Sequence, residues 1–193
     1  HKKEILEKLV GALHKLHDAA VVEADSFSVK EAYFNKTMQR LHTIRDLVPL
    51  ADRRTVTVNG RVCRNVFFYK RELERALLHC EYFALIHGDC TFSNMMLRED
   101  GTPVLIDPRG YFGFSEIYGD PMYDWAKLYY SLAGNYDRFN LKDFRLEIAE
   151  DGVRLEIGSN GWEDMEEAFF CMTGADRRTI RLLHAVIWLS LTT

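Results

Sequence analysis

The segment I-H-G-D-C-T-F-S-N-M-M-L, residues 86–97, holds two polar side chains whose types and spacing could carry out chemistry. Asp89 and Asn94 lie five residues apart, and a short apolar run follows them at once. The carboxylate of an aspartate can accept a proton from a hydroxyl group, and the amide oxygen of an asparagine can bind a hard cation. A loop has no structural use for this pairing, whereas metal-assisted phosphoryl transfer has one.

A third polar residue, Asp107, follows the next apolar run, and the turn between the two runs predicts where it lies. The runs M-M-L and V-L-I flank Asp100-Gly101, a pair typical of a two-residue hairpin loop. A hairpin with this loop places Asn94 directly opposite Asp107. Cross-strand neighbours have Cβ atoms about 4.5–5.5 Å apart, so the two side chains could share one Mg²⁺ ion. Asp89 would then face this metal site as the acceptor of a hydroxyl proton.

The motif H-G-D-x-x-x-x-N, followed by I-D and then by G-D-P-x-x-D-x-A, resembles the aminoglycoside phosphotransferase and choline kinase family, which is related to the protein kinases. The resemblance implies that Asp89 is the catalytic base, that Asn94 and Asp107 bind Mg²⁺, and that ATP is the phosphate donor. It also implies that His87 braces the catalytic loop and that Asp124 ties the loop down from a helix. The acceptor would be a hydroxyl group of a small molecule such as a sugar, an aminoglycoside or an amino alcohol.

These motifs cover residues 86–131, and the segments L-I-D-P-R-G-Y-F-G and Y-G-D-P-M-Y-D-W-A-K-L are similar to a bacterial branch sometimes associated with surface-polysaccharide or sugar-nucleotide genes. The family implies that ATP binds between a helical C-terminal lobe and a β-rich N-terminal lobe. Residues 1–193 contain no G-x-G-x-x-G loop and no strand-borne lysine with suitable neighbours. We therefore expect a single C-terminal catalytic lobe over residues 1–193, without the N-terminal lobe or a fused domain that would complete it. Such a lobe alone would hold metal and ATP poorly.

Three residues near the motif each leave two interpretations open. Pro108-Arg109 departs from the Phe-Gly that follows the corresponding aspartate in kinases, and Arg109 could contact a phosphate or an anionic substrate, or pair with a carboxylate. Asp120 precedes Pro121 and could cap a helix there, or contact substrate or metal. Asp124 lies one turn into that helix, where a near-core carboxylate needs hydrogen-bond donors, which favours a structural tether over chemistry.

Two further groups of side chains have a structural and a functional interpretation. Aromatic residues are dense between residues 111 and 130, where they could form core or the wall of a sugar or choline site. Four acidic residues could complement the dipole of a helix start or hold a cationic substrate. The aromatic residues are Tyr111, Phe112, Phe114, Tyr118, Tyr123, Trp125, Tyr129 and Tyr130, and the acidic residues are Glu163, Asp164, Glu166 and Glu167.

The composition places the chain among soluble globular proteins. The 25 basic and 29 acidic residues give a net charge of −4, which argues against nucleic acid or a membrane surface as the primary partner. The 4 cysteines are widely spaced and suggest neither a zinc site nor a disulfide framework. We expect reduced thiols in a cytoplasmic protein, with Cys90 serving in packing. The most apolar segment, L-L-H-A-V-I-W-L-S-L, is shorter than the about 20 residues that span a bilayer.

The hydrophobic pattern predicts an α+β fold that is mainly helical and carries small β-hairpins, as expected for the C-terminal lobe of a protein-kinase-like fold. Ser28 and Glu31 form a capping-box signature for the second helix, and Gly174 is a candidate C-cap. Predicted helices cover residues 3–17, 28–47, 69–80, a segment from Pro121, 163–173 and 176–192; predicted hairpins cover residues 55–63, 95–106 and 144–157.

Two other functions remain as alternatives. A catalytically inactive, pseudokinase-like module could scaffold a partner, but such a module does not need all of Asp89, Asn94 and Asp107. A Mg²⁺-dependent phosphohydrolase could use Asp107 as a nucleophile, but the D-x-D motif of that chemistry is absent because Pro108-Arg109 follows.

Overall fold

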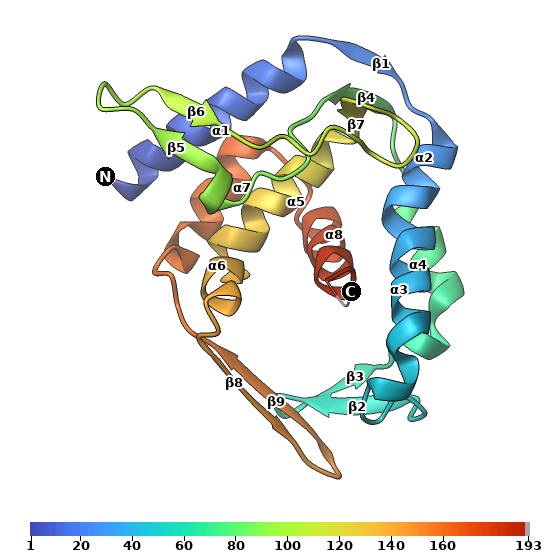
Figure 1. The fold of residues 1–193 in the computed structure, drawn as a ribbon. Helices are drawn as coiled ribbons and strands as arrows, with labels where there is room; N and C mark the ends of the chain where they lie inside the picture. Colours follow the sequence, from blue (N-terminus) through green and yellow to red (C-terminus); the bar gives the residue numbers. More distant parts are fainter. Residues whose placement is uncertain (192–193) are drawn as a thin grey trace.

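A computed structural model describes residues 1–191 and shows a mixed α+β fold (Figure 1). The helices are α1 (Lys2–Asp18), α2 (Ser26–Lys30), α3 (Lys36–Ile44), α4 (Lys70–Leu77), α5 (Pro121–Leu132), α6 (Tyr136–Asn140), α7 (Glu166–Thr173) and α8 (Arg177–Leu189), with a π-helical segment at Glu31–Asn35 and 3₁₀ turns at Arg45–Leu47, Val66–Phe68, Phe92–Asn94 and Glu163–Met165. The strands are β1 (Val21–Glu23), β2 (Thr55–Val58), β3 (Arg61–Arg64), β4 (Tyr82–Leu85), β5 (Met95–Leu97), β6 (Pro103–Leu105), β7 (Tyr118–Gly119), β8 (Phe144–Ile148) and β9 (Gly152–Ile157).

Helix α5 lies at the centre of the hydrophobic core, between α1, α7 and α8 (Figure 1). Nine of its 12 residues are buried, so nearly every face of the helix is packed. Helix α1 contributes an apolar stripe that includes Leu6, Leu9 and Leu13. Helix α1 packs against β4 and α7, and burial of this stripe stabilises the arrangement, because each fully buried leucine contributes about 2 kcal/mol.

Three small sheets complete the fold, and the third of them lies away from this core (Figure 1). Strand β4 lies between β1 and β7 with antiparallel pairing, and it leads directly into residues 86–91. Strands β5 and β6 form a separate hairpin. The third sheet has the order β3-β2-β9-β8 and joins two segments that are far apart in sequence, with Thr57 opposite Gly152 in a parallel pair.

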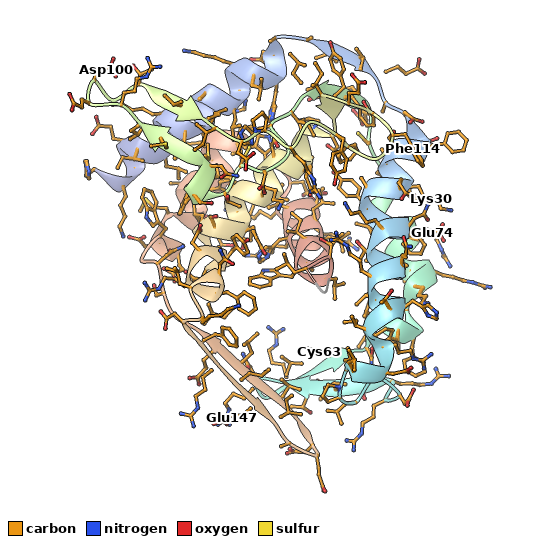
Figure 2. All side chains as sticks on the ribbon, viewed as in Figure 1. Lys30, Cys63, Glu74, Asp100, Phe114 and Glu147 are labelled. Carbon is orange, nitrogen blue, oxygen red and sulfur yellow. The ribbon has the colours of Figure 1, made fainter. Side chains whose placement is uncertain are left out.

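Helices α2 and α3 form one column with α4 beside it, and the third sheet lies at its lower end in Figure 1. The ammonium group of Lys30 lies 2.6 Å from the carboxylate of Glu74, which links α2 to α4 (Figure 2). No helix within residues 1–191 is long and apolar enough to cross a membrane.

Most predicted elements are confirmed. Asn59 and Gly60 have positive φ values of 48° and 78°, as a type I′ turn requires. Asp120 caps α5 by accepting the N–H of Met122 at 2.9 Å, and Gly174 ends α7 with a φ of 63°. The predicted end of the last helix at residue 192 lies outside the described residues. The assignment of the chain to a C-terminal lobe stays a prediction.

The predicted start of the second helix is wrong. Asp25 is the N-cap of α2, and its carboxylate accepts the N–H groups of Phe27 and Ser28 at 3.0 and 3.1 Å. Ser28 lies inside the helix and donates its hydroxyl to Asp25 at 2.6 Å. The helix begins earlier because Asp25 accepts two backbone N–H groups of the first turn, whereas the hydroxyl of Ser28 donates to Asp25.

The predicted register of the β5–β6 hairpin is wrong by one residue. Met95 lies opposite Leu105, because the loop contains the three residues 99–101 and not two. Gly101 adopts a left-handed φ of 78°, and the carboxylate of Asp100 accepts a backbone N–H two residues later at 2.8 Å. Both features close a three-residue loop, which the sequence pair alone does not distinguish from a shorter one.

Candidate active site

The buried carboxylate of Asp124 anchors the loop that follows β4. Its Oδ2 accepts the backbone N–H of His87 at 2.8 Å, and its Oδ1 accepts that of Gly88 at 2.7 Å. Nε2 of His17, on α1, lies 3.0 Å from Oδ2. The side chain of Asp124 is fully buried, so these donors compensate for its lost hydration. The geometry is that of a tether between α5, α1 and the loop.

His87 connects this loop to the segment after β6. Its Nε2 lies 2.8 Å from the carbonyl oxygen of Ile106, which can only accept, so Nε2 carries the proton. Its Nδ1 accepts the backbone N–H of Asp89 at 3.3 Å, and its carbonyl oxygen accepts that of Arg109 at 2.8 Å. Because both ring nitrogens are engaged, the geometry favours bracing over acid–base chemistry for His87.

Gly88 allows these two segments to approach closely. Its φ is +79°, and a Cβ atom at this position would lie 2.8 Å from Cβ of Arg109. A larger residue would therefore combine backbone strain with a steric clash. The glycine of the H-G-D motif is thus required by the packing of the loop against Arg109.

Asp89 projects from the loop and is held by two side chains. Its Oδ1 lies 2.9 Å from Nζ of Lys127, and its Oδ2 accepts Nδ2 of Asn94 at 3.1 Å. The carboxylate of Asp89 retains 36% of its exposure, so a small hydroxyl compound can reach it. Lys127 was not identified from the sequence. Its position on α5, three residues after Asp124, could have indicated that it faces the same loop.

The structure corrects the predicted pairing of Asn94 with Asp107. The N–H of Ile106 donates to the carbonyl oxygen of Asn94 at 3.0 Å, so Asp107 lies one residue beyond this pair. Asp107 is exposed and has a left-handed φ of 56°. The two residues therefore remain neighbours at the base of the hairpin, although they do not oppose each other directly.

The oxygen atoms of Asn94 and Asp107 fit the preference of Mg²⁺ for hard ligands. Nδ2 of Asn94 donates to the carbonyl oxygen of Asp89 at 3.0 Å as well as to its carboxylate. This orientation leaves the amide oxygen of Asn94 free within residues 1–191. In the same residues no group of three or more His, Cys, Asp or Glu side chains could hold a metal ion. A cation bound here would therefore also need water or phosphate oxygens, as Mg²⁺ commonly does.

Arg109 directs its guanidinium group toward two tyrosines. Its Nη1 donates to the hydroxyl of Tyr123 at 2.6 Å, and its guanidinium lies over the ring of Tyr111, 5.0 Å from the centroid. The sequence left two interpretations open for Arg109, a contact with an anionic ligand or an ion pair with a carboxylate. In the part of the chain that the structure describes, Arg109 forms no ion pair with a carboxylate.

A cavity of about 280 Å³ lies beside Arg109, lined by the π-helical segment Glu31–Asn35, α3, the segment 109–113, α5 and the residue that follows α8. We call it the cationic cavity, because its lining includes Lys36, Arg40 and Arg109 with a single carboxylate, Glu31. Hydrogen bonds from Arg109 and Lys36 lower the pKa of Tyr111, which also lines the cavity, to about 8. The sequence did not predict this cavity, because Lys36 and Arg40 lie on a helix far from the motif along the chain.

Two residues near the loop serve in structure. Asp120 is buried; it caps α5, and its second oxygen accepts the hydroxyl of Tyr33 at 2.8 Å. Burial raises the pKa of its carboxyl. Cys90 is fully buried, and burial raises the pKa of its thiol well above the usual value. Such a thiol is a poor nucleophile, in agreement with a packing role.

The chain belongs to the phosphotransferase enzyme family, whose family model matches residues 1–167. The match extends from α1 into α7, so it includes the loop with Asp89 and Asn94, the segment with Asp107, and the anchoring residue Asp124. A comparison with curated proteins found no match. The family assignment agrees with the resemblance seen in the H-G-D-x-x-x-x-N motif.

Proposed function

We propose that this phosphotransferase moves the γ-phosphate of ATP to a hydroxyl group of a small molecule, with Asp89 as the catalytic base. The observation that carries the proposal is the double restraint on Asp89, whose carboxylate contacts Lys127 at 2.9 Å and Asn94 at 3.1 Å while it stays accessible. A general base must be held in a defined orientation within reach of the hydroxyl proton.

The proposed step has a simple balance of bonds and protons. The acceptor oxygen attacks the γ-phosphorus, the bond between this phosphorus and the β–γ bridging oxygen breaks, and ADP leaves. The hydroxyl proton passes to Oδ1 or Oδ2 of Asp89. Lys127 and Asn94 keep the carboxylate oriented throughout.

Asn94 and Asp107 would hold Mg²⁺ through their side-chain oxygens, and the bound cation would neutralise charge on the ATP phosphates. Support for this comes from the free amide oxygen of Asn94 and the exposed carboxylate of Asp107 at the base of the same hairpin. Asp124 and His87 would act indirectly, because they fix the backbone of the loop and do not face the acceptor.

ATP consumption by the full-length protein tests the proposal. The assay measures ADP release with Mg²⁺ and a panel of sugars, hydroxy acids, sugar phosphates and amino alcohols. We expect acceptor-dependent release that falls by at least about 100-fold in Asp89→Asn, because a general base contributes 10²–10⁴-fold. The matched control is Asp151→Asn, which removes an exposed carboxylate at the tip of the β8–β9 hairpin.

Two outcomes would contradict the proposal. Equal activity of the wild type and Asp89→Asn would remove Asp89 from the chemistry. Absence of turnover with every acceptor, together with absence of Mg²⁺-dependent ATP binding in calorimetry, would leave a binding module in place of an enzyme.

A further inference from the structure

The charges that line the cationic cavity are not neutralised within the protein. Lys36 and Arg109 both direct hydrogen bonds to the hydroxyl of Tyr111, at 3.2 and 3.4 Å. Arg40 donates to the carbonyl oxygen of Ser190, at the end of α8. A neutral phenol and a carbonyl group do not cancel a full positive charge. None of these three cations forms an ion pair among the residues described, 1–191.

The single carboxylate in the cavity, Glu31, already accepts a hydrogen bond from Asn35 at 2.9 Å. Three cations and one carboxylate leave two net positive charges at its wall. A cavity of this composition attracts an anion and repels a cation, and its low-dielectric walls strengthen the effect.

The acidic residues that could have bound a cationic substrate have partners inside the protein. Glu166 accepts the hydroxyl of Tyr129 at 2.7 Å and a guanidinium N–H of Arg181 at 2.9 Å. Glu167 pairs with Arg177, and Asp164 pairs with Lys2 at 3.1 Å. Glu163 accepts the amide of Asn135 at 2.9 Å. Three of these four carboxylates are therefore paired with a cation, and Glu163 accepts a neutral amide, so the cluster offers a cationic ligand little unpaired charge.

The position of Arg109 connects the cavity to the candidate catalytic loop. Its backbone N–H donates at 2.8 Å to the carbonyl oxygen of His87, two residues before Asp89, and its Cβ lies 2.8 Å from where a Cβ atom would stand on Gly88, the residue next to Asp89. A small molecule whose anionic end contacts Arg109 could therefore present its other end to the carboxylate of Asp89. The volume of about 280 Å³ lies near the lower limit of ligand sites, about 300–1,000 Å³, which suits a small metabolite better than a nucleotide.

The cavity wall is also preorganised. The hydrogen bond to Tyr123 fixes the orientation of the Arg109 guanidinium, whose fork of N–H groups matches phosphate and carboxylate oxygens. The backbone N–H of Phe114 donates to Oγ of Ser28 at 3.1 Å, which ties the loop after Arg109 to α2. A rigid wall lowers the entropic cost of binding.

We infer that the cationic cavity binds a phosphate or carboxylate group of the acceptor substrate, whose hydroxyl group then lies toward Asp89. This inference rests on the proposed function, because it names the class of acceptor for the same site: small hydroxyl compounds that carry an oxyanion. Sugar phosphates and hydroxy acids belong to this class, whereas aminoglycosides and choline do not.

Direct binding tests the inference without any turnover. Calorimetry of the full-length protein compares four probes of similar size: glycerol 3-phosphate, glycerate, glycerol and ethanolamine. We expect glycerol 3-phosphate or glycerate to bind at least about tenfold more tightly than glycerol, since charge-assisted hydrogen bonds are the strong ones. The preference between the two anions then distinguishes phosphate from carboxylate. Ethanolamine should bind most weakly.

The variant Lys36→Met removes one charge of the cavity and should weaken binding of the preferred anion by about tenfold. The matched control is Lys15→Met, which removes an exposed lysine from α1, outside the cavity, and should leave the affinity unchanged. Circular dichroism of both variants verifies that they fold. The inference would be overturned if glycerol bound with the same affinity as the anions, or if Lys36→Met left the affinity for the preferred anion unchanged.

Three further results separate this inference from its alternatives. If Lys36→Met weakens the binding of ATP and leaves the binding of glycerol 3-phosphate unchanged, the cavity holds nucleotide phosphates and the inference fails. If turnover occurs only with cationic hydroxyl compounds, the inference fails while the phosphotransferase proposal survives. If the anions bind as expected and no acceptor is ever phosphorylated, the phosphotransferase proposal fails while the anion site remains.

Discussion

The ammonium group of Lys127 lies 2.9 Å from Oδ1 of Asp89, and only 12% of the Lys127 side chain is exposed. The pair joins the centre of α5 to the candidate catalytic loop. Lys127→Met removes this restraint, and we expect kcat to fall by about 100-fold with little change in KM for the acceptor, because small misplacements of a catalytic group are costly. Lys127→Arg should recover part of the loss. Steady-state kinetics with unchanged kcat in Lys127→Met would show that Asp89 needs no such partner.

Gly88 and Gly110 form a matched pair for testing how the loop packs against Arg109. Both have positive φ, 79° and 75°, so alanine is strained at either position. Only at Gly88 would the new Cβ meet Cβ of Arg109, at 2.8 Å; nothing lies within 4 Å of the corresponding atom at Gly110. Urea denaturation should show that Gly88→Ala lowers the free energy of unfolding by about 1–3 kcal/mol more than Gly110→Ala does. Equal losses would indicate that the clash is relieved by movement of the segment.

The anchoring carboxylate of Asp124 predicts a large effect on stability. Asp124→Ala leaves the buried N–H groups of His87 and Gly88 without their acceptor. We expect a loss of about 3–5 kcal/mol in the free energy of unfolding, as for other broken buried pairs.

The comparison variant is Asp176→Asn, which alters the exposed N-cap of α8, where Asp176 accepts the N–H of Thr179 at 2.8 Å. It should cost no more than about 1 kcal/mol. Hydrogen exchange gives a second readout, since the amides of His87 and Gly88 should lose protection in Asp124→Ala, which removes both acceptor oxygens. Retained protection of both amides would mean that Asp124 does not anchor the loop.

Local sequence signals predict several structural elements around the candidate site correctly. The Asp120-Pro121 pair predicts the start of α5 correctly, because an aspartate cap and a proline in the first turn act within a few residues. The hairpins were found for the same reason, since Asn59 and Gly60 suit a left-handed turn. The register of the β5–β6 hairpin is not predicted correctly, because the pair Asp100-Gly101 is compatible with a loop of two residues and with a loop of three.

Contacts between segments far apart in the chain are not predicted by the sequence pattern. Lys127 contacts Asp89 because α5 packs against the loop, and the spacing of residues within the motif does not predict this contact. The cationic cavity likewise requires Lys36 of α3 to lie beside Tyr111, 75 residues later in the chain. Family resemblance supplied the roles proposed for the motif residues but not these partners, which depend on tertiary packing.

The partly buried His184 determines how the stability of the fold responds to acid. Burial lowers its pKa from 6.5 to about 4, and its Nε2 accepts the indole N–H of Trp188 at 2.8 Å, which requires the unprotonated nitrogen. Between these two pKa values the unfolded chain binds a proton that the folded protein does not bind. The free energy of unfolding should therefore fall as the pH drops from about 6.5 toward 4, by up to about 3 kcal/mol.

The variant His184→Gln can still accept a hydrogen bond but does not titrate in this range. Urea denaturation at pH 7 and pH 4.5 should show a smaller pH-dependent loss in His184→Gln than in the wild type. The exposed control His42→Gln should keep the loss of the wild type. The same pH dependence in all three proteins would assign the acid sensitivity to other groups.

The lowered pKa of Tyr111 gives the cationic cavity a pH dependence of its own. Hydrogen bonds from Arg109 and Lys36 hold this pKa at about 8. Below that pH the phenol is neutral, and above it the phenolate adds a negative charge beside these two cations. Among the groups that line the cavity, Tyr111 is the one whose pKa its surroundings lower into this range.

We therefore expect the affinity for glycerol 3-phosphate to fall by about fivefold between pH 7 and pH 9, since the phenolate competes for the same cations. Tyr111→Phe should bind the probe with an affinity that is nearly constant over this range. The control Tyr82→Phe, which alters an exposed tyrosine of β4, should behave like the wild type. Calorimetry at the two pH values measures all three proteins, and a fall in affinity that persists in Tyr111→Phe would exclude Tyr111 as its cause.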